Sequence, residues 1–321
     1  MEEHFLKWIN IVDFKCFHEF EVNNLRRVNL IGGKNNIGKT AFLEACYIHA
    51  FTKNVASFAA SLAHIKVARE NINILNEVIS TNKKFNPKEY LESTKYYSTT
   101  SNNQKIKFQF SNKDGIKEYL FMINENEKII NANDFSIEYV GSNVDYIDNF
   151  GFSDQELIAN YIAIQEQDKE NELNNLINNF DPKIEFFKVI GDKPKCKIND
   201  EYIDLTEFGD GLKHFISIIC ALYGSKNGQL FIDEIDNGIH YAQIKNIWKL
   251  IFQISKDVNC QVFATTHSKE CIEAFNEVNC EDAGVYLEFY QSKKTNQINV
   301  KQRNKEQLEY SLSHNGEFRG E

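Results

Sequence analysis

The sequence has no long hydrophobic run and no excess of basic residues. No apolar stretch approaches the roughly twenty residues that a membrane-spanning helix needs, and the acidic start Met1–His4 is the opposite of the basic start of a signal peptide. We therefore expect a cytoplasmic protein without a membrane partner. Lys and Arg number 36 and Asp and Glu number 46, a net charge of −10. This balance argues against a surface that binds nucleic acid everywhere and leaves only a local basic patch for that purpose.

The seven cysteines do not form a disulfide framework. They are scattered, odd in number and mostly within apolar runs such as Ile218–Leu222, which is typical of reduced thiols in the core of a cytosolic protein. The chain has 321 residues, of which 42% are hydrophobic, enough for one large α/β domain or two smaller ones. We find no internal repeat and no sustained heptads, so a long coiled coil is excluded.

A strand, a glycine-containing turn and an amphipathic helix are predicted at Arg27–Ala50. Within them Gly33, Gly38, Lys39 and Thr40 complete the pattern G-x-x-x-x-G-K-[ST], in the context that a phosphate-binding loop requires. The glycines let backbone N–H groups face a triphosphate, and the helix N-terminus adds partial positive charge. Lys39 would reach the outer phosphates, and Thr40 would offer its hydroxyl to Mg²⁺. A Gly-Asn-rich turn that only looks like such a loop is the alternative.

The first half of the chain is predicted to add a β lobe and several helices. Phe5–Glu21 alternates apolar and polar residues as one or two strands would, and Phe51–Thr81 has the periodicity of a helical hairpin or a long bent helix. Tyr96–Tyr139 is typical of alternating strands, with an antiparallel hairpin across Lys105–Ile123. Asp154–Phe180 has helical spacing, and we interpret it as a helical insertion.

The C-terminal third alternates strands and helices. We predict a markedly apolar helix at Leu212–Tyr223, a second helix at Tyr241–Ser255 and a buried strand at Gln261–Thr265. Another apolar strand begins at Gln229, and the tail from Val285 adds two short strands and a helical end. Such alternation is the signature of an α/β fold whose mostly parallel sheet is covered by helices on both faces.

Two carboxylates follow the apolar run Leu230–Ile232. A strand of this kind beside the phosphate-binding loop would put Asp233 next to the Mg²⁺ that Thr40 also contacts. Glu234, one residue further on, could polarise the attacking water without binding the ion. An ordinary strand that ends in a polar turn is the alternative, and the phosphate-binding loop upstream favours the Walker B interpretation.

A histidine and a pair of glycines complete the candidate site. His267 follows a buried strand, so we expect it at the C-terminal edge of the sheet, where ligands bind in open α/β folds. A neutral imidazole there could hydrogen-bond the γ-phosphate or the attacking water. Gly209 and Gly211 flank Asp210 at the start of a helix, where two glycines can form an anion-binding platform. A plain helix cap by Asp210 is the alternative.

The ordered set GGKNNIGKT, FGDGL, LFIDEIDNGIHY and FATTHS resembles the ABC-type ATPases related to the overcoming-lysogenization-defect (OLD) family and, more distantly, the SMC and RecF proteins. The resemblance covers the N-terminal fifth of the chain and Leu205–Phe275, and the middle matches only in layout. It implies a single ABC-type ATPase head that uses ATP and Mg²⁺. Residues 1–50 and 183–321 would form the nucleotide-binding core, and residues 51–182 would form helical and β-hairpin insertions.

The resemblance also implies roles for individual residues. Asp233 and Glu234 would be the Walker B pair, His267 the switch histidine and Lys39 the catalytic lysine. Thr40 and Asp233 would bind Mg²⁺. The residues expected to contact the nucleotide are Gly33, Lys34, Asn35, Asn36, Ile37, Gly38, Lys39, Thr40 and Ala41 of the Walker A loop and Gly209, Asp210 and Gly211 of the signature loop.

In this class the signature loop presses on the ATP of a second subunit, so the resemblance implies that hydrolysis needs a head-to-head homodimer. Asn237 and Gly238 fall where the family has its dimer-facing D-loop. The signature Phe-Gly-Asp-Gly-Leu lacks the serine with which many ABC proteins touch the γ-phosphate, so this contact would rest on backbone amides. Gln165 and Gln167 are candidates for the Q-loop glutamine.

Some relatives carry a C-terminal Toprim nuclease domain, which needs an acidic metal cluster. Only about fifty residues follow His267, fewer than a domain usually has. They carry a basic patch instead, Lys293, Lys294, Lys301, Arg303 and Lys305. We therefore expect an ATP-hydrolysing switch that controls a separate effector, such as a Toprim-type nuclease in bacterial anti-phage defence. An ATP-gated, RecF-like DNA-binding protein of DNA repair and a phosphotransferase remain as alternatives.

Overall fold

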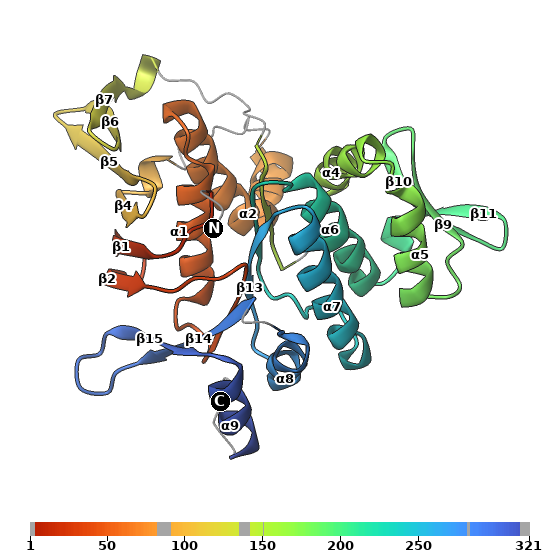
Figure 1. Ribbon diagram of the computed structural model, residues 1–321. Coiled ribbons are helices and arrows are strands. Elements are labelled where there is room, and N and C mark those ends of the chain that lie inside the picture. Colours follow the sequence, from red (N-terminus) through yellow and green to blue (C-terminus); the bar gives the residue numbers. More distant parts are fainter. Residues whose placement is uncertain (1–3, 82–90, 135–141, 150, 281–282, 315–321) are drawn as a thin grey trace. The chain divides into compact units, whose positions relative to one another are not determined.

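The computed structural model describes residues 4–81, 91–134, 142–149, 151–280 and 283–314 (Figure 1). The chain divides into two compact units. The first comprises Met1–Leu25, Thr40–Ser142 and Gln291–Asn299, and the second comprises Arg26–Lys39, Asn143–Tyr290 and Val300–Glu321. The end of the strand-rich stretch that we predicted to reach Tyr139 lies outside the described residues.

The first unit contains an antiparallel sheet of six strands in the order β2-β1-β4-β5-β6-β7. Its strands are β1 (Ile9–Phe14), β2 (Phe17–Val22), β4 (Tyr96–Ser101), β5 (Lys105–Lys113), β6 (Ile116–Ile123) and β7 (Asn126–Asn131). The predicted antiparallel hairpin is confirmed, because β5 pairs with β6 from Ile106 to Lys113. Asp114 and Gly115 form its two-residue turn, and both have positive φ, as the tight turns of hairpins require.

Two helices follow the phosphate-binding loop in sequence. α1 (Lys39–Phe51) ends at a short break, and α2 (Val55–Thr81) begins after it. The break arises at Asn54, whose side-chain oxygen accepts a hydrogen bond from the backbone N–H of Ser57, as an N-cap residue does. The expected helical structure is therefore present as one long helix after α1. In the core of the first unit, the ring of Phe58 on α2 lies 5.5 Å from that of Phe121 on β6.

The second unit contains a six-stranded sheet in the order β15-β14-β3-β13-β12-β8. Its strands are β3 (Val28–Gly33), β8 (Val144–Ile147), β12 (Gln229–Ile232), β13 (Gln261–Thr265), β14 (Gly284–Gln291) and β15 (Ile298–Arg303). The five adjacent strands from β14 to β8 all run parallel to one another. Every residue of β12 and β13 is buried, as is typical of parallel strands covered on both faces. The predicted α/β fold with a mostly parallel sheet is confirmed.

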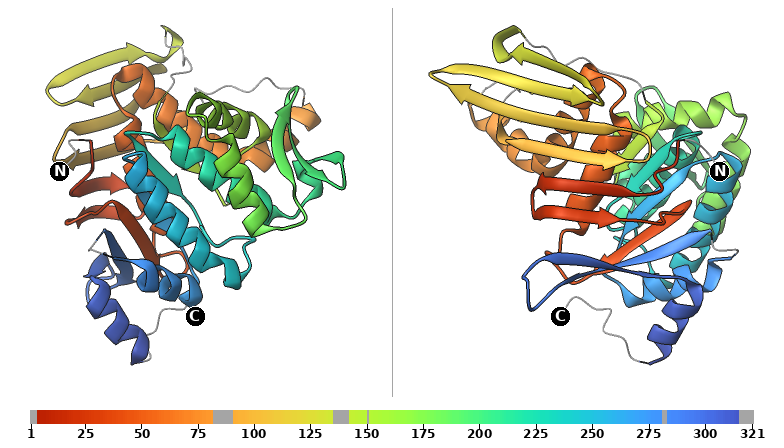
Figure 2. Two further views of the ribbon diagram at one scale, coloured as in Figure 1. Left: turned by 45° about the vertical axis from the view of Figure 1, so that its right-hand side comes forward. Right: turned by 60° about the vertical axis from the view of Figure 1, so that its left-hand side comes forward.

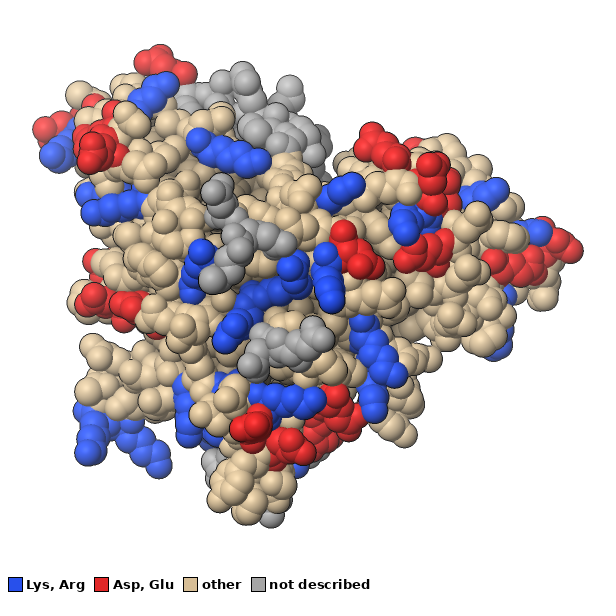
Figure 3. Space-filling view, viewed as in Figure 1, with Lys and Arg blue, Asp and Glu red and all other residues tan. Residues whose placement is uncertain are grey.

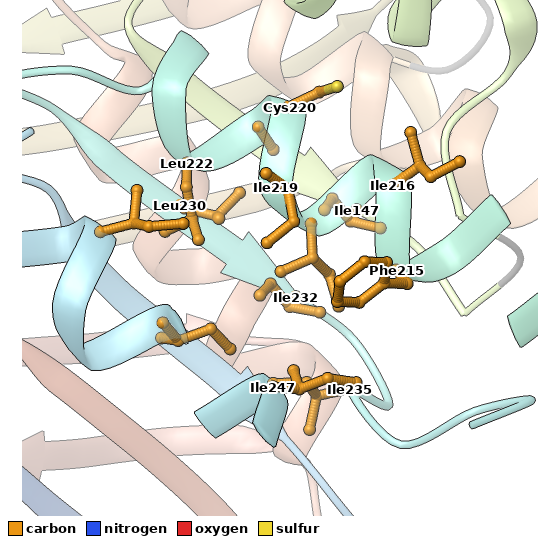
Figure 4. Packing of buried hydrophobic residues seen from close by; sticks show 14 of the residues in the cluster. Ile147, Phe215, Ile216, Ile219, Cys220, Leu222, Leu230, Ile232, Ile235 and Ile247 are labelled. Carbon is orange, nitrogen blue, oxygen red and sulfur yellow. The ribbon is translucent and has the colours of Figure 1, made fainter. Parts of the chain in front are cut away.

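Helices of the second unit pack beside its sheets and against one another. They are α4 (Asp154–Glu166), α5 (Glu170–Phe180), α6 (Asp210–Gly224), α7 (Tyr241–Asp257), α8 (Lys269–Val278) and α9 (Lys305–Ser313). α6, α7 and α8 lie side by side (Figure 2). Figure 4 shows Ile219 and Leu222 of α6 close to Leu230 of β12, all within one buried cluster. This apolar layer fixes the strand whose end carries the two candidate carboxylates.

Strand β8 was not anticipated from the sequence. Val144–Ile147 lies within residues 51–182, which we interpreted as insertions, yet it pairs in parallel with β12 and forms an edge of the core sheet. A run of four residues is too short to show a periodicity. α4 and α5, which follow it, contact α6 in the same unit. The other boundaries between core and insertions stay a prediction.

A small antiparallel sheet lies next to α5 (Figure 1). It consists of β9 (Phe186–Ile190), β10 (Lys193–Ile198) and β11 (Glu201–Asp204), in the order β11-β10-β9. In the part of the chain that the structure describes, no helix is both long and apolar enough to cross a bilayer. All seven cysteines are free, and all but Cys16 and Cys280 are buried, which confirms core thiols at the other five positions.

Candidate nucleotide-binding site

The phosphate-binding loop follows β3, between β14 and β13 in the sheet of the second unit. Gly33 closes β3 with a φ of +133°, and a Cβ atom there would overlap the carbonyl oxygen of Phe289 on β14. Asn36 and Gly38 also have positive φ, 58° and 92°. Only glycine fits at position 33, because the neighbouring strand leaves no room for a side chain. The adjacent strand therefore determines the path of the loop.

Lys39 is the first residue of α1, and its ammonium group lies inside the loop. Its Nζ donates hydrogen bonds to the carbonyl oxygens of Gly33 and Lys34, both at 2.8 Å, and only 4% of the residue is exposed. Burial lowers the pKa of Lys39 to about 8, although the charges of Asp233 and Glu234 work against this shift. The loop is thus formed around a buried cation, and a triphosphate would add the negative charge that stabilises it.

Strands β12 and β13 end at the same edge of the sheet as the phosphate-binding loop, and the Walker B pair, Asp233 and Glu234, follows β12 at this edge. The two strands are parallel, with Ile232 opposite Ala264, so their carboxyl ends coincide. The Thr265 hydroxyl donates to Oδ1 of Asp233 at 2.6 Å, and the same oxygen of Thr265 accepts from the backbone N–H of Glu234 at 2.8 Å. Asp233 is only 9% exposed.

His267 lies between the loop lysine and the second carboxylate. Its Nδ1 is 3.1 Å from Nζ of Lys39, and its Nε2 is 3.5 Å from Oε1 of Glu234. Burial, together with the charge of Lys39, lowers the pKa of His267. Burial raises the pKa of Glu234, and repulsion by Asp233 and Asp236 adds to that shift. A neutral imidazole can accept a hydrogen bond from the ammonium group through Nδ1 while its Nε2–H faces the carboxylate.

The remaining residues of the phosphate-binding loop are neighbours of Lys39 in the sequence. Lys34, Asn35 and Asn36 are exposed, Ile37 and Ala41 are buried, and Thr40 is half-buried as the second residue of α1. The N-terminus of a helix such as α1 favours phosphate oxygens, because its partial positive charge and its first N–H groups point toward an anion. The loop therefore fits a nucleotide phosphate.

Mg²⁺ also fits the chemistry of these residues. Within the residues that the structure describes, no group of three or more His, Cys, Asp or Glu side chains could hold a metal ion. Mg²⁺ does not need such a group when it is bound by one or two protein oxygens and by substrate phosphates. Thr40 belongs to the first unit and Asp233 to the second, and their joint binding of Mg²⁺ stays a prediction.

The predicted signature turn lies at the start of α6, where we considered a plain helix cap by Asp210 as the alternative. Gly209 is the N-cap residue, without a side-chain hydrogen bond, and Asp210 is already helical, so a plain cap by Asp210 is wrong. A Cβ atom on Gly211 would overlap the carbonyl oxygen of Gly238. The signature turn therefore packs backbone to backbone against the predicted D-loop, in which the side chain of Asn237 donates to Asn149.

The two candidate Q-loop glutamines bond near the ends of α4 and α6. Nε2 of Gln167 donates to the carbonyl oxygens of Ala163 and Tyr223, and Nε2 of Gln165 lies 3.4 Å from the Glu170 carboxylate. These contacts hold the end of α4 against its neighbours and do not include the phosphate-binding loop.

Sequence reasoning missed the hydrogen bonds of three residues near the candidate site: Thr265, Thr266 and Asp236. The Thr266 hydroxyl donates to Oδ1 of Asp236 at 2.7 Å. Both threonines belong to the motif FATTHS, and Asp236 belongs to FIDEID. The sequence signal was therefore a pair of hydroxyls at the end of β13 and a further carboxylate in the turn after β12. Only the register between β12 and β13 shows which hydroxyl meets which carboxylate.

Comparison with known proteins supports an ATPase. Residues 147–272 match the family described as the AAA ATPase domain, a segment that contains Asp233, Glu234 and His267. The chain is also similar to an ATP/GTP phosphatase of Helicobacter pylori, with 25% identity over 341 residues that cover 84% of this chain and 87% of that protein.

Two solved structures of similar fold are SMC heads. One is an SMC head bound to the C-terminal winged-helix domain of ScpA, with a TM-score of 0.54, 10% identity and coverage of 94% of this chain and 98% of that chain. The other is an SMC head with an extended coiled coil, bound to the C-terminal domain of ScpA from Pyrococcus furiosus. Its TM-score is 0.53, with 10% identity and coverage of 97% of this chain and 99% of that chain. The fold is thus similar to that of SMC head domains, and the match over residues 147–272 supports an ATPase domain of AAA type.

Proposed function

We propose that this chain hydrolyses ATP and acts as a nucleotide-gated switch. The observation that carries the proposal is the cluster at the edge of the sheet, where His267 lies between Lys39 and Glu234. A carboxylate beside a neutral imidazole suits a water molecule as the attacking group. This arrangement favours hydrolysis over phosphate transfer to a small molecule.

Each residue of the cluster has a separate role in the proposed hydrolysis. Lys39 and the backbone N–H groups of the loop bind the phosphates and stabilise the charge that develops on them. Glu234 accepts a proton from water, and a carboxylate with a raised pKa is the stronger base. The water oxygen then bonds to the γ-phosphorus, and the bond to the β–γ bridging oxygen breaks to give ADP and phosphate. His267 hydrogen-bonds the γ-phosphate or the water. Mg²⁺, bound by Thr40 and Asp233, would neutralise charge on the phosphates.

A head-to-head homodimer is the second part of the proposal. Gly209 and Asp210 are exposed at the start of α6, so a second copy can approach this turn. Backbone N–H groups at a helix N-terminus favour anions. We propose that the signature turn contacts the ATP held by the loop of the other copy, that ATP binding closes the dimer, and that hydrolysis opens it.

The effector is proposed from the OLD-like resemblance. A switch of this kind controls a partner that reads the closed or open state, and the similar SMC heads were solved with a bound ScpA domain. We propose a cytoplasmic setting in bacterial anti-phage defence, with a Toprim-type nuclease on a separate chain. A nonspecific nuclease activity of the purified chain alone would contradict this part.

An ATP-gated, RecF-like DNA-binding protein is the second candidate. Two lysines, Lys293 and Lys294, are exposed at the tip of the hairpin between β14 and β15, and Figure 3 shows blue side chains at that corner of the view. Such a local patch can bind phosphates despite the net negative charge. DNA affinity that appears only with ATP and falls with salt would support this function, and its absence at low salt would contradict it.

Phosphate release from ATP tests the proposed chemistry. Wild-type protein should hydrolyse ATP, and Glu234→Gln should lose at least ~100-fold in kcat while it still binds ATP. Lys39→Ala should lose binding as well, because the buried cation in the loop is gone. Hydrolysis by Glu234→Gln at the wild-type rate would remove Glu234 from the mechanism.

A further inference from the structure

β13 ends in two buried threonines whose hydroxyls reach different carboxylates of the turn that follows β12. Thr265 is 1% exposed and Thr266 is 0% exposed. Thr265 bonds Asp233, and Thr266 bonds Asp236. Two side chains of one type at one strand end thus have separate partners, which allows their effects to be separated by experiment.

Thr265 holds three consecutive residues of that turn. Its hydroxyl donates to Asp233 and accepts from the backbone N–H of Glu234, at 2.6 and 2.8 Å. Its carbonyl oxygen accepts from the backbone N–H of Ile235 at 3.0 Å. The hydroxyl therefore uses both its donor and its acceptor capacity on the Walker B pair.

The conformation of Glu234 needs such support. Its φ is +52°, in the left-handed region that residues other than glycine adopt at a cost. The bond to its N–H fixes the peptide plane before it, and the bond to Ile235 fixes the plane after it. The direction in which the Glu234 side chain leaves the backbone thus depends on Thr265.

We propose that Thr265 is a positioning residue for ATP hydrolysis. It fixes the orientation of the Asp233 carboxylate and the backbone of Glu234 together, so that the metal ligand and the general base keep one relative arrangement. Thr265 acts through these two residues and does not itself bind the nucleotide. The inference rests on the proposed ATPase function, since it assigns Thr265 a role in that reaction.

The test uses the full chain with three substitutions. Thr265→Val keeps the shape of the side chain and removes the hydroxyl, Thr265→Ser keeps the hydroxyl, and Thr266→Val removes the neighbouring hydroxyl, which bonds Asp236. The measurements are kcat and KM for ATP with Mg²⁺, and the affinity for Mn²⁺ by electron paramagnetic resonance with a non-hydrolysable ATP analogue. Thermal melts show whether each variant folds.

We expect Thr265→Val to lower kcat and the Mn²⁺ affinity by ~10- to 100-fold each, as the loss of a group that orients a metal ligand does. KM for ATP should change less than ~3-fold, because Lys39 and the loop are intact, and Thr265→Ser should recover most of both losses. Thr266→Val should keep the wild-type Mn²⁺ affinity. If Thr265→Val does not fold, Thr265→Ala takes its place.

Three results would overturn the inference: wild-type kcat and Mn²⁺ affinity in Thr265→Val, a Thr265→Ser variant as impaired as Thr265→Val, or an equal loss of Mn²⁺ affinity in Thr266→Val. A wild-type protein that binds the analogue and Mn²⁺ but hydrolyses no ATP would contradict the proposed function instead. The comparison of Mn²⁺ affinities would then still show whether Thr265 orients Asp233.

Discussion

Lys39 gives a quantitative prediction, because its ammonium group is already buried in the loop before nucleotide binds. Burial lowers its pKa from 10.5 to about 8. On that basis ~10% of the Lys39 side chains are neutral at pH 7, ~50% at pH 8 and ~90% at pH 9. A triphosphate beside the ammonium group favours the charged form and raises the pKa again. ATP binding should therefore take up ~0.5 proton at pH 8 and ~0.9 proton at pH 9.

The sign of the pH dependence follows from this uptake. The ATP-bound state holds more protons than the free state, so the affinity for ATP must fall as the pH rises through the pKa of about 8. Well above pH 8 the loss approaches ~tenfold per pH unit, until the pKa of the bound form is reached. At pH 7 nearly all Lys39 is charged, and the uptake by this group falls to ~0.1 proton.

Titration calorimetry measures the uptake directly. A non-hydrolysable ATP analogue with Mg²⁺ is titrated at pH 7, 8 and 9, each in two buffers of different ionisation enthalpy. Lys39→Arg is the matched control, because a guanidinium group stays charged over this range, and its uptake should be close to zero. No uptake by the wild-type protein at pH 9, or equal uptake in Lys39→Arg, would refute the reasoning.

Four substitutions, with Gly115→Ala as a control for the first, test other parts of the structure. Gly33→Ala should abolish ATP binding, because a Cβ there overlaps the backbone of β14 at a φ of +133°; Gly115→Ala, which meets nothing within 4 Å in a hairpin turn, should bind ATP normally. Gly211→Ala should lose ATP-dependent dimerisation but still bind ATP, because it displaces only the signature turn. His267→Ala should lose ~100-fold in kcat with smaller changes in ATP affinity. Asp145→Asn should stabilise the protein at pH 7, by on the order of 2 kcal/mol in thermal or urea unfolding.

The Asp145 prediction depends on the sign of its shift. Burial raises the pKa of Asp145 from 3.8 to about 6, although hydrogen bonds from Ser225 and Asn160 work against the shift. Its stabilising contribution is therefore fully present below pH 3.8 and is lost as the pH rises through about 6. The variant should gain more relative to wild type at pH 7 than at pH 5. An equal gain at both pH values would contradict the assigned cause.

The predictions for Gly33, Gly211 and His267 can each be contradicted by a specific result. ATP binding by Gly33→Ala at wild-type affinity would show that the loop tolerates a different path beside β14. A Gly211→Ala variant that still dimerises with ATP would separate the signature turn from the dimer interface. Unchanged kcat in His267→Ala would leave Glu234 as the only group acting on the water.

Long periodic segments and the glycine pattern made much of the fold predictable. The strand at Gln261–Thr265 has the predicted ends, because Val262, Phe263 and Ala264 form a short apolar run that the polar residues Gln261 and Thr265 flank. The phosphate-binding loop is where the motif placed it, since the pattern G-x-x-x-x-G-K-[ST] constrains the backbone and not only the chemistry. His267 was expected at the C-terminal edge of the sheet because it follows a buried strand, whereas its 3.1 Å distance from Lys39 is seen only in the structure.

Features that depend on register could not be predicted from the sequence. The four residues of β8 carry no periodicity of their own, and they form a strand because β12 offers an open edge beside them. The hydrogen bond from Thr265 to Asp233 needs the pairing of β12 with β13. The close approach of Gly211 to Gly238 joins two turns that are distant in sequence, and neither glycine pattern alone indicates it.

The most direct test of the switch is the solution mass of Glu234→Gln, measured by light scattering with and without ATP and Mg²⁺. This substitution removes the proposed base and keeps Asp233, so the ATP-bound state should accumulate. The account predicts that the mass doubles only with ATP, and that Lys39→Ala remains a monomer under the same conditions. A Glu234→Gln protein that binds ATP tightly at an unchanged monomeric mass would contradict the head-to-head switch.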